Sequence, residues 1–288
     1  MGKRMDAMLF PGGKQKALTL SYDDGVVQDR RLLDILDRYG LKATFNLGAG
    51  VLGYRGKANM NGREVDISKV APEEVAELYA NHEVAGHGLW HSSLSSVGTP
   101  AAMYEIIEDK RRLEGLTNKL IRCFAYPFGT FNDEVKELLR LAGYEGARTV
   151  ISTGRFDIPG DFLAWEATCH HNDPKLMALV KEFCEGGHPF APAQLFYLWG
   201  HAYEFDADDN WARIEGFASY VSQYAGSIWF ATNGQIVDYV KAFRQLKYSA
   251  DASLVMNPTN TALWLKMPRQ VVCVPPGETV RIPDTGLE

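Results

Sequence analysis

The stretch Ala17-Leu-Thr-Leu-Ser-Tyr-Asp-Asp-Gly25 decides how the chain is interpreted. Its first six residues alternate in the manner of a β-strand, so the two carboxylates stand at a strand's C-terminal end with a glycine turn behind them. Adjacent like charges are unfavourable unless a cation or a proton compensates them. Such a pair is more typical of a site than of a solvated surface, which makes Asp23 and Asp24 candidate functional residues.

A second polar cluster follows about one strand-helix unit later, at His87-Gly-Leu-Trp-His91. Because the two imidazoles are four residues apart, we expect them to face the same way on one helical turn. One carboxylate and two histidines form the open three-ligand set of a catalytic metal ion, with a position left for water. The other carboxylate is then free to act as a base.

Four blocks resemble the motifs of the polysaccharide deacetylases, the NodB-homology group of carbohydrate esterases. Ser21 to Gly25 resembles the family's TFDDG signature, and His87 to His91 resembles its H-x-x-x-H motif. Phe124-Ala-Tyr-Pro-Phe-Gly129 is similar to the third motif of a Phe-Ala-Tyr-Pro subgroup, and Leu198-Trp-Gly-His201 to the last motif. Asp-Asp-Gly alone is more often a turn, and H-x-x-x-H alone could be an ordinary loop, but here the blocks occur in the family's order.

The resemblance implies that one divalent metal ion is bound by Asp24, His87 and His91. Imidazole and carboxylate ligands suit zinc first, and cobalt, nickel or manganese would also fit. It further implies that Asp23 is the base and that His201 protonates the departing amine, although a histidine that ends an apolar strand can also be a core residue. The third motif would stabilise the oxyanion through the backbone N–H of Phe128. Contacts with the substrate would come from the third motif and the last motif, through Tyr126, Pro127, Phe128 and Trp199.

Two departures from the family pattern affect the second shell of this site. Ala125 stands where the third motif often has an arginine that orients the catalytic Asp, and Arg148 on the next predicted strand is the candidate substitute. The fourth motif, an Asp-Trp block that tunes the histidine acid, is not recognisable. Asp157, Asp161 and Trp165 lie near the corresponding stretch, and the sequence does not choose among them.

The apolar patterns predict an α/β protein in which strands and helices alternate over seven units. The predicted strands are 17–22, 42–46, 83–85, 122–126, 144–150, 194–199 and 227–231, and the helices are 31–39, 72–79, one from 99, 133–142, 175–184 and 211–224. Such alternation favours a parallel sheet, open or closed into a barrel. The resemblance implies a distorted (β/α)7 barrel of the NodB-homology type over residues 1–247. The short alternating runs of residues 248–288 predict a small β appendage packed on it.

Composition narrows the class of partner. The 288 residues are 46% hydrophobic and carry a net charge of −6, which supports a globular core and argues against nucleic acid. The four cysteines show no C-x-x-C spacing, so neither a disulfide framework nor a sulfur-ligated metal is expected. The N-terminus reads as neither a signal peptide nor a membrane span, which predicts a cytoplasmic protein, although a trimmed secreted form would look the same.

Three functions are compatible with these observations. The first is metal-dependent hydrolysis of N-acetyl or O-acetyl groups on a carbohydrate. The second is hydrolysis of a small non-peptide amide, such as a ureide or a cyclic imide, which a narrow pocket closed by residues 54–66 and 169–173 would favour. The third is glycan binding without catalysis, which the intact set of polar residues argues against. Several aromatic residues could either stack on sugar rings or fill a core: Trp90, Tyr126, Trp165, Trp199 and Tyr203.

Overall fold

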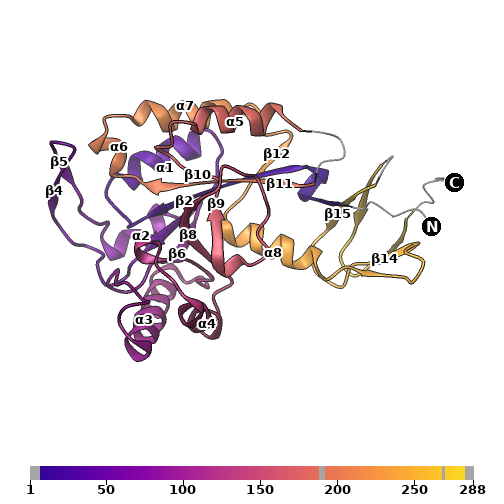
Figure 1. The fold of residues 1–288 in the computed structure, drawn as a ribbon, viewed down its shortest axis with the longest axis horizontal. Coiled ribbons are helices and arrows are strands. Elements are labelled where there is room, and N and C mark those ends of the chain that lie inside the picture. The colour runs from indigo at the N-terminus through magenta and orange to yellow at the C-terminus, as the bar shows by residue number, and fades with distance from the viewer. Residues whose placement is uncertain (1–6, 188–191, 268–269, 283–288) are drawn as a thin grey trace.

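The computed structural model describes residues 7–187, 192–267 and 270–282. Its centre is a parallel sheet in the order β10-β11-β2-β3-β6-β7-β8-β9, with β12 paired to the first half of β2 (Figure 1). The strands of this sheet are β2 Lys16–Asp23, β3 Ala43–Leu47, β6 Glu83–Gly86, β7 Cys123–Ala125, β8 Gly146–Ser152, β9 Trp165–Ala167, β10 Cys169–His170, β11 Gln194–His201 and β12 Ile228–Phe230.

The sheet closes almost completely because β9 and β10 are two halves of one interrupted strand. β9 pairs with β8, β10 pairs with β11, and only Thr168 separates them. Thr168 donates its backbone N–H to the carbonyl of Tyr197 (2.9 Å) and accepts the N–H of Tyr197 on its hydroxyl (3.0 Å). The predicted fold class, a distorted α/β barrel with a small C-terminal β appendage, is confirmed. The strand that closes it was not predicted.

Helices cover the outside of the barrel on opposite sides in Figure 1, where α1, α5 and α7 lie together and α3 and α4 lie across the sheet from them. α1 buries Leu32, Leu33 and Leu36 and is followed by Gly40 in the left-handed region (φ 67°). The α-helices are α1 Asp29–Arg38, α2 Val75–Leu78, α3 Thr99–Thr117, α4 Asp133–Leu141, α5 Leu176–Glu185, α6 Glu204–Ala207, α7 Trp211–Ser222 and α8 Asn233–Phe243. Single 3-10 turns occur at Pro11–Gly13, Pro72–Glu74, Pro127–Gly129 and Phe162–Ala164.

Among the described residues, two small antiparallel sheets lie at the C-terminal end of the chain. β1 (Ala7–Leu9) joins β15 (Leu263–Lys266) and β16 (Val271–Val274), while β13 (Lys247–Tyr248), β14 (Leu254–Met256) and β17 (Thr279–Arg281) form a second sheet. The N-terminal strand therefore contributes to the C-terminal region. Tyr239 of α8 ties it to the barrel, since its hydroxyl donates to the carbonyl of Leu9 (2.6 Å) and accepts the N–H of Trp264 (3.1 Å). Residues 283–288 of the predicted appendage lie outside the described residues.

A hairpin of β4 (Lys57–Met60) and β5 (Arg63–Asp66) projects from the opposite end of the molecule in Figure 1. Asn61 at its tip donates to Asp208 (2.7 Å), which also accepts from Asn172 (2.7 Å). Asp208 thus links segments 54–66 and 169–173, the two segments that were expected to close a narrow pocket. No helix within the described residues is long and apolar enough to span a membrane.

Strand register brings the polar residues of separate motifs together. His201 pairs with Asp23 across β11 and β2, and Asp23 pairs with Asn46 across β2 and β3. All three stand at the C-terminal ends of their strands, the end at which barrel enzymes carry their chemistry.

A substitution of Gly86, at the end of β6, tests how tightly the residues around this strand end are packed. A β-carbon there would lie 2.5 Å from the Tyr144 hydroxyl and 2.9 Å from the Phe124 ring, both buried. We expect Gly86→Ala to lower the free energy of unfolding by about 1–3 kcal/mol through overpacking. The matched control, Gly115→Ala on the exposed face of α3, meets no atom within 4 Å and should raise stability by about 0.5–1 kcal/mol. Denaturant titration of both variants measures the difference, and equal stabilities would contradict it.

Candidate active site

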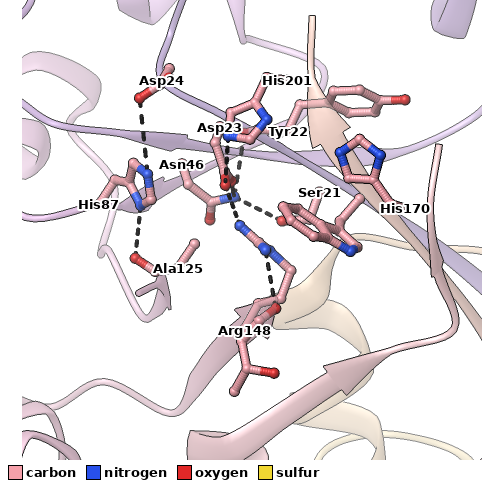
Figure 2. Close-up of polar contacts among 12 residues, drawn as sticks. Ser21, Tyr22, Asp23, Asp24, Asn46, His87, Ala125, Arg148, His170 and His201 are labelled. Carbon is pink, nitrogen blue, oxygen red and sulfur yellow. Dashed lines mark hydrogen bonds and ion pairs between the residues drawn. The ribbon is translucent and has the colours of Figure 1, made fainter. Parts of the chain in front are cut away.

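Asp23 is a buried carboxylate held on both oxygens. Asn46 Nδ2 donates to its Oδ1 (2.8 Å) and also lies 2.7 Å from Ser21 Oγ, while the guanidinium of Arg148 forms an ion pair with Oδ2 (Figure 2). Burial would raise the pKa of Asp23, but the charges of Arg148, His87 and His201 outweigh it and lower the pKa to about 2. Asp23 is therefore an anion of fixed orientation throughout the physiological pH range.

Arg148 supplies the partner that the third motif lacks. Its side chain is fully buried, lies over the ring of Trp199 (4.5 Å to the centroid) and donates to the carbonyl of Thr149 (3.1 Å). Ala125, at the position where the family often has arginine, pairs with Arg148 across β7 and β8. The guanidinium thus reaches Asp23 from the neighbouring strand.

Asp24, His87 and His91 converge beside Asp23. Their ligand atoms all lie within 4.8 Å of one another, with Asp24 Oδ1 4.0 Å from His87 Nε2 and 3.8 Å from His91 Nε2. The structure therefore brings together the three residues that the sequence assigned to one metal ion.

The tautomer of His87 fits a metal ligand. Its Nδ1 lies 2.8 Å from the carbonyl of Ala125, which fixes the proton on Nδ1 (Figure 2). Its Nε2 is buried and has no hydrogen-bond partner among the described residues. Burial lowers the pKa of His87 to about 4, so the imidazole is neutral and its lone pair is available. A divalent cation satisfies such a nitrogen.

The expected helical turn from His87 to His91 is wrong, because this segment is a loop. Gly88 (φ 74°) and His91 (φ 57°) both adopt left-handed conformations, which end helical geometry. The imidazoles nevertheless meet, with ring centroids 4.7 Å apart. Asp24 (φ 81°) and Phe128 (φ 58°) are also left-handed, so backbone strain gathers where the candidate ligands lie.

Two carboxylates of α3, one helical turn apart, hold this loop. Asp109 accepts the backbone N–H groups of Ala49 (2.7 Å) and His87 (3.0 Å). Glu105 accepts the N–H of Trp90 (2.8 Å) and the hydroxyl of Ser92 (2.7 Å). Burial raises the pKa of Asp109 to about 7 even though these N–H donors oppose the rise. Neither residue stands out in the sequence, because an acidic pair on a helix usually faces solvent.

Lys69 is a cation beside the candidate metal ligands. Its Nζ lies 3.4 Å from Asp24 Oδ1, and its side chain is mostly buried. Burial would raise the pKa of Asp24, but Lys69 and then His87 and His201 outweigh it and lower the pKa. Lys69 therefore compensates the same carboxylate that the metal ion would use.

A second polar cluster surrounds Glu204 at the start of α6. Its carboxylate lies 3.4 Å from Nδ1 of His201 and 3.1 Å from Nε2 of both His170 and His171, and it accepts the backbone N–H of His201 (3.1 Å). Burial alone would lower the pKa of His201, but Glu204 and then Asp23 raise it above its usual value. The histidines in turn hold the pKa of Glu204 far below its usual range despite burial. Glu204 is thus the charge partner of His201, a role that the sequence left unassigned.

This second cluster lacks the proton arrangement of a metal site. His170 Nδ1 accepts the N–H of Asn172 (3.1 Å), so the ring proton is on Nε2, which faces Glu204. His171 Nδ1 is packed against Gly200 and has no acceptor among the described residues. A ligating histidine normally donates its second N–H to an acceptor, as His87 does. The Glu204 cluster is therefore less suited to a cation than the set of Asp24, His87 and His91.

The remaining predicted residues differ in exposure. Trp199 is nearly buried, with its ring 6.0 Å from that of His201, and Pro127 is buried. The Tyr126 side chain is in the core, where its hydroxyl donates to the carbonyl of Leu163 (2.7 Å) and its ring stacks on Phe131. Phe128 is exposed, and its ring lies 4.5 Å from that of His91.

Several solved structures of other proteins are similar to this chain. A candidate polysaccharide deacetylase from Mycobacterium smegmatis is 18% identical, has a TM-score of 0.58, and the match covers 83% of this chain and 94% of that one. A family 4 carbohydrate esterase from Streptomyces lividans, in complex with acetate, is 16% identical with a TM-score of 0.48 and coverages of 75% and 92%. The Streptococcus pyogenes deacetylase PplD is 19% identical with a TM-score of 0.44, and the match covers 51% of this chain and 61% of that one. This chain therefore spans less than two thirds of that protein.

The sequence profile of the family described as polysaccharide deacetylase matches residues 11–147. This region contains the first three of the four motif blocks, from Ser21 to Gly129. Residues 11–147 of this chain are therefore similar to the polysaccharide deacetylase family.

Proposed function

We propose that this chain is a metal-dependent hydrolase that removes acetyl groups from a carbohydrate, with N-acetyl groups as the first choice. The observation that carries the proposal is a pair of oppositely tuned groups beside an open ligand set. Asp23 is held as an anion, His201 has a raised pKa, and Oδ2 of Asp23 lies 3.8 Å from Nε2 of His201. Two titratable groups whose pKa values are shifted in opposite directions suit one base and one acid.

The ion would be held by Asp24, His87 and His91, and zinc is our first choice. When bound there, a divalent cation polarises the acetyl carbonyl and lowers the pKa of a coordinated water towards neutrality. Asp24 and His91 keep part of their side chains exposed, so substrate can reach them from solvent.

Asp23 would accept the proton of the attacking water. A carboxylate with a pKa of about 2 is a weak base, so this transfer depends on a water that is itself acidified. Arg148 and Asn46 fix the orientation of the carboxylate and prevent its rotation away from the water.

His201 would donate a proton to the departing amine, because an amide nitrogen leaves poorly as an anion. Glu204 favours the protonated imidazole required for this step. The Phe128 backbone N–H, in the strained third motif, is our candidate donor to the oxyanion, and Trp199 would wall the acetyl pocket.

Acetate release from N-acetylglucosamine oligomers by metal-reconstituted protein, with chelated protein as the control, tests the proposal. We expect metal-dependent release. The bridge between the β4–β5 hairpin and Asn172 through Asp208 keeps a small-amide hydrolase as the second candidate. Failure to release acetate, combined with hydrolysis of a ureide or a cyclic imide, would favour that candidate.

Substitutions of Asp24 and Asp23 distinguish the proposed metal ligand from the proposed base. Asp24→Asn removes a ligand charge, so we expect a fall in metal affinity of at least about 100-fold. Asp23→Asn should retain the metal and lose turnover by about 100-fold or more. Isothermal titration with Zn²⁺ and acetate release measure the two properties. If Asp23→Asn retained full turnover, Asp23 would not be the base.

Removal of the Lys69 charge should strengthen metal binding. We expect Lys69→Met to raise Zn²⁺ affinity about tenfold, because a cation 3.4 Å from Asp24 Oδ1 opposes a second cation on that oxygen. Lys57→Met is the control, since Lys57 pairs with Glu64 on the exposed hairpin. Calorimetry reports both affinities, and a weaker site in Lys69→Met would show that Lys69 supports the ligand instead.

The pH dependence of turnover tests the role of Glu204. Its negative charge raises the pKa of His201, so the acidic imidazolium persists to higher pH in the native protein. We expect Glu204→Gln to move the alkaline limb of the kcat profile to lower pH. Asp206→Asn removes a charge from the same helix, from a residue that contacts Gln28 and Trp211. Only the pH profile of the Glu204→Gln variant should shift. Coincident profiles for this variant and the native protein would contradict the assignment of Glu204 as the charge partner of His201.

A further inference from the structure

Helix α3 buries two carboxylates on the face that packs against the barrel. Glu105 and Asp109 are four residues apart, so they lie on one face of the helix, and both are buried. The same stripe contains the buried apolar residues Ala102 and Ile106. Two like charges in such a stripe are unfavourable unless each accepts hydrogen bonds, so the donors that face them indicate their role.

Asp109 fixes the first histidine of the candidate metal set. Its Oδ2 accepts the backbone N–H of His87 (3.0 Å), and its Oδ1 accepts the N–H of Ala49 (2.7 Å) in the loop after β3. A β-carbon on Gly86 would lie 3.1 Å from Oδ2, so the carboxylate lies directly against the end of β6. Both oxygens of Asp109 therefore face backbone N–H groups, which can only donate.

Glu105 fixes the residues on either side of the second histidine. Its Oε2 accepts the N–H of Trp90 (2.8 Å), and its Oε1 accepts the hydroxyl of Ser92 (2.7 Å). Between them, His91 has a left-handed backbone (φ 57°), and its own N–H reaches the carbonyl of Gly88 only at 3.3 Å. The carboxylate therefore replaces hydrogen bonds that a helical turn would have supplied.

We propose that Asp109 and Glu105 are positioning residues for the metal site, one for each histidine ligand. Asp109 acts through His87 and Glu105 acts through His91, while neither belongs to the ligand set itself. The two imidazoles are thus held with their ring centroids 4.7 Å apart before an ion binds, so the ion does not have to order the loop. This inference rests on the metal site of the proposed function and identifies what sets its affinity.

The two carboxylates differ in how they respond to replacement by an amide. The hydroxyl of Ser92 can donate or accept, so Glu105→Gln can keep both contacts, with its carbonyl oxygen on the N–H of Trp90 and its NH2 group on the Ser92 oxygen. Asp109→Asn always places its NH2 group against one of two backbone N–H groups. Each substitution removes one carboxylate, so a difference between them reports hydrogen bonding.

Calorimetry with Zn²⁺ on the whole chain tests the inference. We expect Asp109→Asn to weaken Zn²⁺ binding about 10- to 100-fold and Glu105→Ala to weaken it about tenfold. Glu105→Gln should recover most of the affinity that Glu105→Ala loses. Glu108→Gln is the matched control, since Glu108 lies on the same helix and pairs with Arg111 and Arg112, and its affinity should match that of the native protein.

A purely structural role of the two carboxylates predicts a different result. The variants would then unfold at lower denaturant concentration and a smaller fraction of the protein would bind, but the folded molecules would keep the native Kd for Zn²⁺. Native affinity in Asp109→Asn, or equal affinity in Glu105→Ala and Glu105→Gln, would overturn the inference. The Glu105 variants keep the test decisive where Asp109→Asn does not fold.

Acetate release separates this inference from the proposed function. The expected order of Zn²⁺ affinities in a protein that releases no acetate would retain the positioning residues and overturn the proposed function. Metal-dependent acetate release with the same Zn²⁺ affinity in all variants would retain the proposed function and overturn the positioning residues. Native protein that binds no Zn²⁺ would overturn both.

Discussion

The buried ion pair between Asp23 and Arg148 is the interaction on which the arrangement of the site depends. Two charges inside a barrel are tolerated only when each has a partner, and removal of one partner typically costs about 3–5 kcal/mol. Here the pair joins β2 to β8, which are not neighbours in the sheet. Arg148 also lies over Trp199, so one guanidinium fixes both the candidate base and the wall beside His201.

The two imidazole–carboxylate groups illustrate how proton positions distinguish similar compositions. Each contains two histidines and one carboxylate with ligand atoms within 4.8 Å. His87 donates Nδ1–H to a carbonyl and leaves Nε2 free, whereas His170 accepts an N–H on Nδ1 and presents its proton to Glu204. The first arrangement suits a bound cation, and the second suits the ionised carboxylate of Glu204 next to His201. On our proposal, the rim of the barrel has a metal side at Asp24, His87 and His91 and a proton side at His201 and Glu204.

Much of this could be predicted from the sequence because its signals are local. The seven predicted parallel strands are present, since a short run rich in apolar residues marks each of them. The closing strand β9–β10 was missed, because two short segments interrupted at Thr168 carry too little periodicity. Helix α8 was also missed. The segment from His87 to His91 was expected to be helical, but Gly88 and His91 adopt left-handed backbone conformations that residue spacing does not reveal. Arg148 could be proposed as the partner of Asp23 from its place on the next predicted strand, and the ion pair confirms it. Glu204 lies outside the family's motifs, and only the turn after β11 shows what it contacts.

The division between a metal side and a proton side is the central claim, and anomalous diffraction from Zn²⁺-soaked crystals tests it most directly. The account predicts one strong zinc peak bound by Asp24, His87 and His91, with Lys69 displaced from Asp24, and no peak at Glu204. A zinc ion bound by His170, His171 and Glu204, or no ion at Asp24, would contradict it.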